Sequence, residues 1–265
     1  MNKGLYFLYN SIVGRFFLKI ASSHLIANVY AKYMNSKLSK NKIKKYIKKY
    51  NIDMNEYEKK DYSSFNDFFT RNIIKNKRKI KDGIVAVCDA KLSVYKITEG
   101  SFFKIKNSIY TVNELFRETD INYDYALIFR LGVEDYHHYI FPDDGFVRSS
   151  KFIKGILHTV QPIAFKKYKV FSENSRNVTF LECKNLGDVC YIEVGAMLIG
   201  KIVNEKVDRF KKGDEKGHFE FGGSTVVLLL KNNIKIREDI LNNTKCGVET
   251  LVKLGETIGE IKYEK

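Results

Sequence analysis

Three short segments of the chain carry side chains suited to proton transfer and nucleophilic attack. Asp89 follows an apolar run, and Ser224 lies between two glycines and a run of aliphatic residues. His137 and His138 stand side by side in an aromatic stretch between these segments. An aspartate, a histidine and a serine are the components of a charge relay, in which the histidine takes the serine proton and the aspartate orients the histidine. The segments lie far apart in sequence, so the fold must bring them together for this chemistry to occur.

Two simpler interpretations apply to these residues. A Gly-Gly-Ser sequence before a buried strand is most often only a turn. A Ser-His-Asp hydrolase would keep Ser224 as a serine, but no glycine follows at the place that a nucleophile elbow requires. Neighbouring residues of a strand point to opposite faces, so only one of His137 and His138 can face a given site.

The elements that position these residues are strands from residue 84 onward. Short β-branched or aromatic runs alternate with turn residues such as Asp82-Gly83 and Asp144-Gly145. This pattern predicts an α+β fold whose main part is an antiparallel, barrel-like β domain. The predicted strands are Ile84–Cys88, Leu92–Ile97, Phe102–Ile105, Tyr125–Leu131, Tyr136–Phe141, Val178–Leu181, Val189–Val194, Met197–Val203 and Thr225–Leu230.

The amino-terminal part of the chain is expected to be helical and basic. Apolar residues recur at steps of three and four from Leu5 to Ile20, which predicts one amphipathic helix, and the pattern continues to Tyr33. Arg15 and Lys19 interrupt the run, so we expect no membrane-spanning helix. No small-x-small cleavage site follows at the right distance, so we expect no signal peptide. A cluster of lysines follows: Lys37, Lys40, Lys42, Lys44, Lys45, Lys48 and Lys49.

An apolar stripe beside a lysine cluster has two interpretations, which remain open. It suits a helix lying on an anionic membrane surface, and it suits a helix that packs on its own domain with a solvated basic face.

Ser64 and Asp67 have the spacing of a helix start, and this helix would carry Phe68, Phe69 and Ile73. Of the two interpretations of the apolar stripe we adopt the membrane surface, and we predict a helical, basic, membrane-associating region at 1–80 and a β-rich catalytic domain at 81–265.

The composition describes a folded protein with a strong positive charge. The chain has 265 residues, of which 44% are hydrophobic, and this excludes a disordered or collagen-like protein. A net charge of +15 favours anionic partners, either nucleic acid or anionic lipid. Only 9 of the 46 basic residues are arginine, the residue that phosphate and base recognition favours. We expect no nucleic-acid partner, and a basic nucleic-acid-binding β module remains an alternative.

Cysteine usage points to a reducing compartment. The four cysteines, Cys88, Cys183, Cys190 and Cys246, are too few for a disulfide scaffold and show no CxxC spacing. We expect free thiols in a cytoplasmic setting and no metal site.

Six segments, taken together and in order, resemble the phosphatidylserine decarboxylases over residues 60–230. The Gly-Ser-Thr and Val-Gly-Ala elements are specific only in combination. The segments are Phe68-Phe69-Thr70-Arg71, Cys88-Asp89-Ala90-Lys91-Leu92, Asp135-Tyr136-His137, Thr159-Val160-Gln161-Pro162-Ile163-Ala164, Glu193-Val194-Gly195-Ala196-Met197-Leu198-Ile199-Gly200 and Phe221-Gly222-Gly223-Ser224-Thr225.

The resemblance implies a proenzyme that cuts itself between Gly223 and Ser224. Gly223 has no Cβ, so its carbonyl can be held in a strained turn and approached closely by Ser224 Oγ. An ester would form, elimination would leave dehydroalanine at 224, and hydrolysis would give a pyruvoyl group. The products would be a long chain, 1–223, and a short chain, 224–265, which pair as a heterodimer; higher oligomers remain open.

The implied cofactor is this pyruvoyl group, made from Ser224. Its ketone would form a Schiff base with the amine of phosphatidylserine and accept the electrons left when CO2 departs. The product would be phosphatidylethanolamine, as a step of phospholipid biosynthesis. The implied setting is the cytoplasmic side of the cell membrane, where the enzyme would bind peripherally to the anionic surface.

Roles follow by matching positions to the family. Ser224 becomes the pyruvoyl group, Asp89 orients the histidine and His137 is the base. The family commonly has a second histidine three residues later, where this chain has Ile140, although Pro142 is kept. His138 and His158 are therefore alternative bases, and a catalytically degenerate lipid-binding relative remains an alternative function. We expect His218 to be a solvated turn residue and His24 to be structural.

Overall fold

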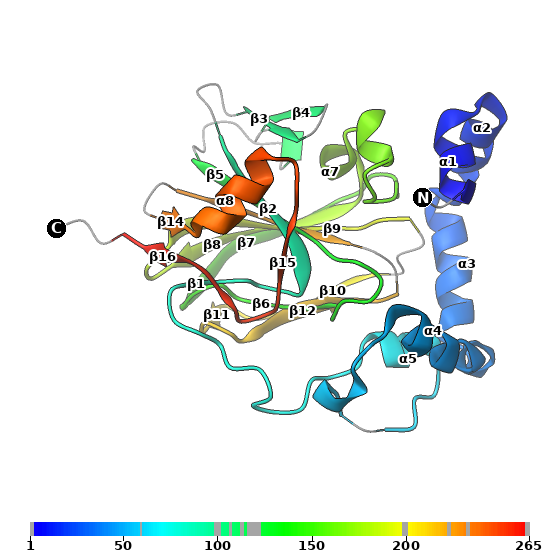
Figure 1. Cartoon of the computed structure of the whole chain (residues 1–265), viewed down its shortest axis with the longest axis horizontal. Helices are drawn as coiled ribbons and strands as arrows, with labels where there is room; N and C mark the ends of the chain where they lie inside the picture. The colour runs from blue at the N-terminus through cyan, green and yellow to red at the C-terminus, as the bar shows by residue number, and fades with distance from the viewer. Residues whose placement is uncertain are drawn as a thin grey trace.

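The computed structural model describes residues 3–58, 60–97, 102–105, 108–111, 114–115, 123–197, 201–221, 224–231 and 234–262. Its amino-terminal helices lie at one end of a β-rich body, and strands β14 and β16 lie at the opposite end (Figure 1).

The single amino-terminal helix predicted from the sequence is wrong, because the chain turns twice. The structure has α1 (Lys3–Asn10), α2 (Ile12–Ala21) and α3 (His24–Met34). Ser11 and Ser23 start the second and third helices, and their hydroxyls accept hydrogen bonds from the backbone N–H of Gly14 and Ile26. A Cβ on Gly14 would lie 2.0 Å from the carbonyl oxygen of Phe7, so only glycine lets α2 approach α1 this closely.

The lysine-rich segment and the capped helix follow as η1 (Lys37–Asn41), α4 (Lys42–Tyr50), η2 (Met54–Glu56) and α5 (Phe65–Phe69). The predicted start of α5 is confirmed, because Ser64 Oγ accepts a hydrogen bond of 3.1 Å from the N–H of Asp67. The helix ends at Phe69 and does not reach Ile73, which forms a bridge with Tyr57 instead. Its buried aromatic rings pack against α3 and α4 through Met34, Ile43, Tyr62, Phe65, Phe68 and Phe69.

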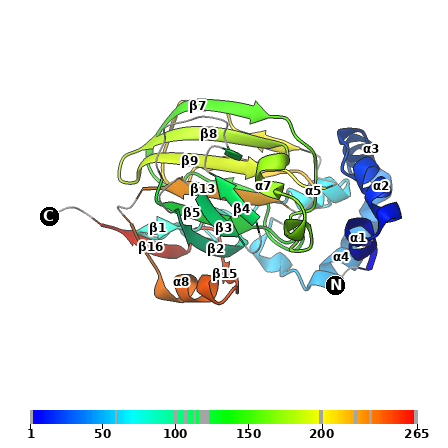
Figure 2. The same ribbon diagram turned by 90° about the horizontal axis from the view of Figure 1, so that it is seen from above.

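The main sheet has eight strands, and every neighbouring pair in it is antiparallel. Strands β7, β8, β9 and β13 lie side by side across the body (Figure 2). This confirms the predicted α+β class, and the sheet stays open between β11 and β15 in the part of the chain that the structure describes. The order is β11 (Arg209–Phe210), β7 (Gly145–Ile153), β8 (Arg176–Cys183), β9 (Gly187–Val194), β13 (Thr225–Leu230), β5 (Tyr125–Arg130), β2 (Ala90–Lys96) and β15 (Thr250–Val252).

Smaller sheets and helices complete the body. One sheet joins β1 (Ile84–Val85), β16 (Thr257–Ile261) and β14 (Ile234–Ile236), and a second joins β10 (Ile202–Asn204), β12 (Glu215–Phe219) and β6 (His138–Ile140). Strands β3 (Phe102–Ile105) and β4 (Ser108–Thr111) form a hairpin. The remaining helices are η3 (Ala164–Lys166), α7 (Val170–Glu173) and α8 (Glu238–Lys245).

The core lies on both faces of the main sheet, and β13 runs through its centre. Val226, Leu228 and Leu230 contribute to one buried cluster, and Val227 and Leu229 contribute to the other. Because both faces are covered, the strand is a continuous apolar run without alternation. Ser224, the residue directly before β13, is fully buried as well.

Candidate active site

Asp89 and Ser224 leave the main sheet at the same edge. Ser224 precedes β13 and Asp89 precedes β2, and both strands pair with β5 between them. Arg130, at the end of β5, is in register with Thr225 on one side and with Lys91 on the other. The antiparallel pairing therefore brings two of the three predicted relay segments to one edge, separated by the width of β5.

Ser224 has a buried hydroxyl group that makes no hydrogen bond to any residue within the described ranges. Its backbone carbonyl accepts a hydrogen bond of 2.9 Å from the N–H of Leu131, which continues the β5–β13 ladder. A buried hydroxyl without a partner costs about 1–3 kcal/mol, so such a group calls for a functional explanation. Gly222 and Gly223 lie outside the described residues, so the predicted cleavage site is seen only from its Ser224 side.

His137 is fully buried beside the segment that leads to Ser224. Its Nδ1 lies 2.8 Å from the backbone oxygen of Asp135. A carbonyl only accepts hydrogen bonds, so Nδ1 carries the proton and Nε2 is the basic nitrogen. The ring packs on Phe69 with centroids 3.9 Å apart, and the carbonyl of His137 accepts a hydrogen bond from Phe219 of β12.

Asp89 is buried and holds three segments together. Its Oδ1 accepts hydrogen bonds from Arg78 and from the N–H of Leu254, and its Oδ2 lies 3.2 Å from Lys253 Nζ. Arg78 also pairs with Glu56 at 2.6 Å. Burial would lower the pKa of Arg78, but Asp89 and Glu56 raise it above its ordinary value. The role of Asp89 in orienting a histidine stays a prediction.

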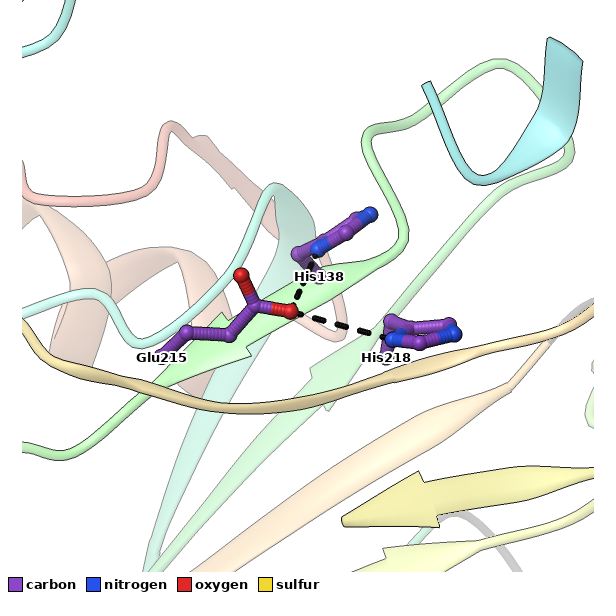
Figure 3. Close-up of side chains that lie close together, drawn as sticks. All are labelled: His138, Glu215 and His218. Atoms are coloured by element: carbon purple, nitrogen blue, oxygen red, sulfur yellow. Dashed lines mark hydrogen bonds and ion pairs between the residues drawn. The ribbon is translucent and has the colours of Figure 1, made fainter. Parts of the chain in front are cut away.

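The two alternative bases have different surroundings. His138, on β6, has its Nδ1 2.8 Å from Glu215 Oε1 (Figure 3). His158 is buried between α1 and Tyr168, with its Nδ1 3.2 Å from the hydroxyl of Tyr9. Burial lowers the pKa of His158 to about 4, so this ring is neutral at physiological pH.

The remaining histidines lie in regular elements. The expectation of a solvated turn for His218 is wrong, because His218 lies within β12 and is only partly exposed. His24 lies on α3, and its Nε2 is 2.9 Å from the carbonyl oxygen of Gly155. This contact ties the amino-terminal helices to the β-rich body.

A cavity of about 430 Å³ opens beside this edge of the sheet. Its wall combines the ends of β2 and β5 with the segments at 159–162 and 196–197. Both segments belong to the stretches that carry the family resemblance, and the sequence alone did not indicate where they lie in the fold. Residues of α1 and α3 close the other side of the cavity. The lining residues are Leu5, Tyr30, Lys91, Arg130, Leu131, Gly132, Val133, Glu134, Thr159, Val160, Gln161, Pro162, Ala196, Met197 and Phe221.

Two cations line this cavity, and each is paired with a glutamate. Lys91 Nζ lies 3.0 Å from Glu134 Oε1, and Arg130 Nε lies 2.8 Å from Glu249 Oε1. Burial would raise the pKa of Glu134, but the Lys91 ammonium hydrogen-bonded to it lowers the pKa below its ordinary value. An anionic ligand would therefore bind these two cations only by displacing the two carboxylates from them.

The amino-terminal helices α1, α2 and α3 also present apolar side chains to solvent. Ile12 is 81% exposed and Leu25 is 73% exposed, whereas Tyr9 and Leu18 pack into the core. In the described part of the chain no single helix is long and apolar enough to cross a membrane; α2 and α3 pass that test only together and are bent by 62°. The exposed apolar residues of these helices are Tyr6, Phe7, Ile12, Val13, Phe16, Phe17, Ile20, Leu25, Val29 and Tyr33.

Sequence comparisons identify proteins similar to this chain. The family described as "Phosphatidylserine decarboxylase" matches residues 65–260. "Phosphatidylserine decarboxylase proenzyme 2" of Clostridium acetobutylicum is 52% identical over 268 residues, which cover 98% of this chain and 92% of that protein. "Phosphatidylserine decarboxylase proenzyme" of Clostridium tetani is 38% identical over 275 residues, which cover 97% of this chain and 92% of the relative.

Proposed function

The chain belongs to the phosphatidylserine decarboxylase family, and from this premise we propose that it converts phosphatidylserine to phosphatidylethanolamine and CO2. The observation that carries the proposal is the cavity beside Ser224. It is lined by two cations and by residues of the apolar helices α1 and α3, and Leu131 in its wall donates its N–H to the carbonyl of Ser224. A lipid with an anionic head group needs this combination of charge and apolar surface.

The first proposed reaction is self-cleavage between residues 223 and 224. Ser224 Oγ loses its proton to His137 and attacks the carbonyl carbon of Gly223; the C–N bond breaks as the ester C–O bond forms. Loss of the α-proton of residue 224 then breaks the Cβ–O bond, which leaves Gly223 as a carboxylate and residue 224 as dehydroalanine. Water adds, ammonia leaves, and residue 224 becomes a pyruvoyl group.

The surroundings of Ser224 support this chemistry. Its hydroxyl makes no competing hydrogen bond in the described part of the chain, so it is free to be deprotonated and to rotate toward the preceding carbonyl. The basic Nε2 of His137 belongs to a ring held by the carbonyl of Asp135 and by Phe69. This backbone contact fixes the tautomer that a general base requires.

The same surroundings fit a pyruvoyl group at position 224. Such a group supplies a ketone that takes up the substrate amine and a conjugated carbonyl system that accepts the electron pair released with CO2. The N–H of Leu131, 2.9 Å from the carbonyl oxygen of residue 224, would polarise that carbonyl. Lys91 and Arg130 would orient the anionic groups of the lipid, and His137 would move a proton near the reacting carbon.

The two products of cleavage would remain one protein. The short chain, 224–265, contributes β13, which pairs with β5 on one side and with β9 on the other. It also contributes β15 at the edge of the same sheet. Removing β13 would expose both halves of the core, so burial favours a tightly bound heterodimer.

We further propose that the protein binds peripherally to the cytoplasmic face of the cell membrane through α2 and α3. The exposed apolar residues of these helices, with Arg15 and Lys19 among them, suit insertion to the head-group level of an anionic bilayer. Because α1 and α3 also line the cavity, a lipid could enter without leaving the membrane surface.

The experiment compares the purified protein with Ser224→Ala and, as a control, with Ser150→Ala, which makes the same substitution at an exposed position of β7. CO2 release from vesicles containing phosphatidylserine and the mass of each protein are measured together. We expect the Ser224→Ala protein to stay whole and inactive, and the control to be cut and active. Decarboxylation by an uncut Ser224→Ala protein would refute the proposal.

A further inference from the structure

We propose that His138, Glu215 and His218 form a binding site for a divalent transition-metal ion of the zinc class. Glu215 Oε1 lies 2.8 Å from His138 Nδ1 and 3.7 Å from His218 Nδ1, and all three ligand atoms lie within 4.8 Å of one another (Figure 3). Two imidazoles and one carboxylate are a common ligand set for zinc, and small movements of these side chains would bring all three to bonding distance.

The fold builds this cluster from two paired strands. His138 of β6 and His218 of β12 are directly opposite each other in the antiparallel register. Residues 215 and 218 of a regular strand would point to opposite faces. The register shifts between Glu215 and Gly217, and this bulge turns Glu215 to the side of the two histidines. A Cβ on Gly217 would lie 2.1 Å from the carbonyl oxygen of Val203, so only glycine lets β10 approach β12 at this position.

The hydrogen bonds of His138 leave a position for a cation. Its Nε2 lies 3.3 Å from the carbonyl oxygen of Thr70, which can only accept, so Nε2 carries a proton. Its Nδ1 and Glu215 Oε1 lie 2.8 Å apart, so the space between them holds either a proton or a metal cation. A metal ion in this position would bind the Nδ1 lone pair, and the contact with Thr70 orients the ring as a metal ligand requires.

His218 supplies an independent observation. Its Nδ1 is buried and makes no hydrogen bond to the residues that the structure describes. The two imidazole rings stack with centroids 4.9 Å apart, and His138 stacks in turn on Tyr136 at 4.6 Å. Two charged rings in this arrangement would repel each other, whereas two neutral rings bound to one ion would not.

The proposed site is open to solvent on the side of Glu215, whose side chain is 45% exposed. Three protein ligands leave a fourth position for water, so the ion would exchange with the solution. Phe219, next to His218, donates its N–H to the carbonyl of His137. A bound ion would therefore hold β12 against β6 next to the proposed base and fix the segment that leads to the cleavage site.

The test uses the Ser224→Ala protein, so that its result does not depend on self-cleavage. Metal-free protein is titrated with Co2+, and bound metal is measured by the visible absorption of the ion and by elemental analysis after dialysis. We expect one equivalent to bind and to raise the melting temperature. Glu215→Gln and His218→Gln should each weaken binding at least tenfold, which corresponds to about 1.4 kcal/mol.

Matched controls carry the same substitutions elsewhere. Glu182→Gln removes a surface partner of Arg148, and His24→Gln changes a histidine outside the cluster. Both should bind Co2+ like the parent. Equal binding by the cluster variants, or no binding by the parent, would overturn the proposal. If a cluster variant fails to fold, chemical modification of His138 and His218 in the parent decides: Zn2+ should protect both, and unchanged modification would overturn the proposal.

Discussion

The buried ion pair between Arg78 and Asp89 gives the sharpest stability prediction. Arg78 has a side chain only 9% exposed, and the Asp89 carboxylate is fully enclosed. Breaking a buried pair by removing one charge typically costs 3–5 kcal/mol, because the remaining charge is left without compensation. Glu56 still neutralises part of Arg78, and Lys253 is 63% exposed and contributes little. We therefore expect Asp89→Asn to lower the free energy of unfolding by about 3 kcal/mol.

The assay is urea denaturation of Asp89→Asn in the uncut Ser224→Ala background, followed by circular dichroism. Asp143→Asn is the control. The buried Asp143 carboxylate accepts hydrogen bonds from the backbone N–H groups of Asn185 and Leu186 and from the side-chain amide of Asn185. Both variants should be destabilised. If Asp89→Asn unfolds at the same urea concentration as its parent, the Arg78–Asp89 pair does not stabilise the fold and the reasoning is wrong.

Asp89→Asn and Asp143→Asn, each made in the protein that keeps Ser224, also test the proposed charge relay. If Asp89 also orients the base, Asp89→Asn should slow cleavage at temperatures where the protein is fully folded, and Asp143→Asn should not. Equal cleavage rates in the two variants would limit Asp89 to the structural role that its contacts describe.

Three further predictions concern single side chains. Burial lowers the pKa of His158 from 6.5 to about 4, so the unfolded chain binds an extra proton between these values. Wild type should lose up to about 3 kcal/mol of stability as pH falls through this window, and His158→Phe should lose correspondingly less in urea denaturation at pH 7 and near pH 4. Replacing Phe16 and Phe17 by serine should weaken sedimentation with anionic vesicles by at least about 100-fold, because the two rings together contribute about 3–6 kcal/mol on burial, and equal sedimentation would count against α2 as the membrane contact. Lys91→Met should raise the KM for phosphatidylserine by about tenfold with little change in kcat, and an unchanged KM would remove Lys91 from substrate binding.

Local patterns predicted those elements whose stability depends on nearby residues. The run Thr225–Leu230 is a strand with the predicted bounds, because a fully buried strand needs no polar alternation. Ser64 starts a helix where its spacing to Asp67 predicts one, since the capping bond joins residues three apart. These features are visible within a short window of sequence.

Other elements were missed because their stability comes from distant partners. β7 alternates exposed and half-buried residues at the outer part of the sheet and lacks an apolar run. β12 carries Lys216, which is buried only because Glu193 of β9 pairs with it. The predicted continuous amino-terminal helix failed for a related reason, since Ser11 and Gly14 allow a tight turn that the apolar spacing conceals.

The candidate site shows the same division. The sequence identified Asp89, His137 and Ser224 as candidates from their side-chain chemistry. The pairing of β2 and β13 with β5 explains how the segments of Asp89 and Ser224 come together. The partners of Asp89 could not be predicted, because Arg78 lies in a segment without a recognisable motif and Lys253 follows Asp89 by 164 residues. The cluster of His138, Glu215 and His218 depends on a strand register and a bulge, which no local pattern encodes.

We propose, above all, that the peptide bond between residues 223 and 224 is cleaved and that Ser224 becomes an electrophilic ketone. The most direct measurement is the intact mass of the purified, active protein under denaturing conditions. We expect a fragment spanning 1–223 and a fragment spanning 224–265 that is lighter than its sequence by one ammonia molecule and has a blocked amino terminus. A single full-length mass, or a short fragment with a free amino-terminal serine, in a preparation that decarboxylates phosphatidylserine would contradict the proposal.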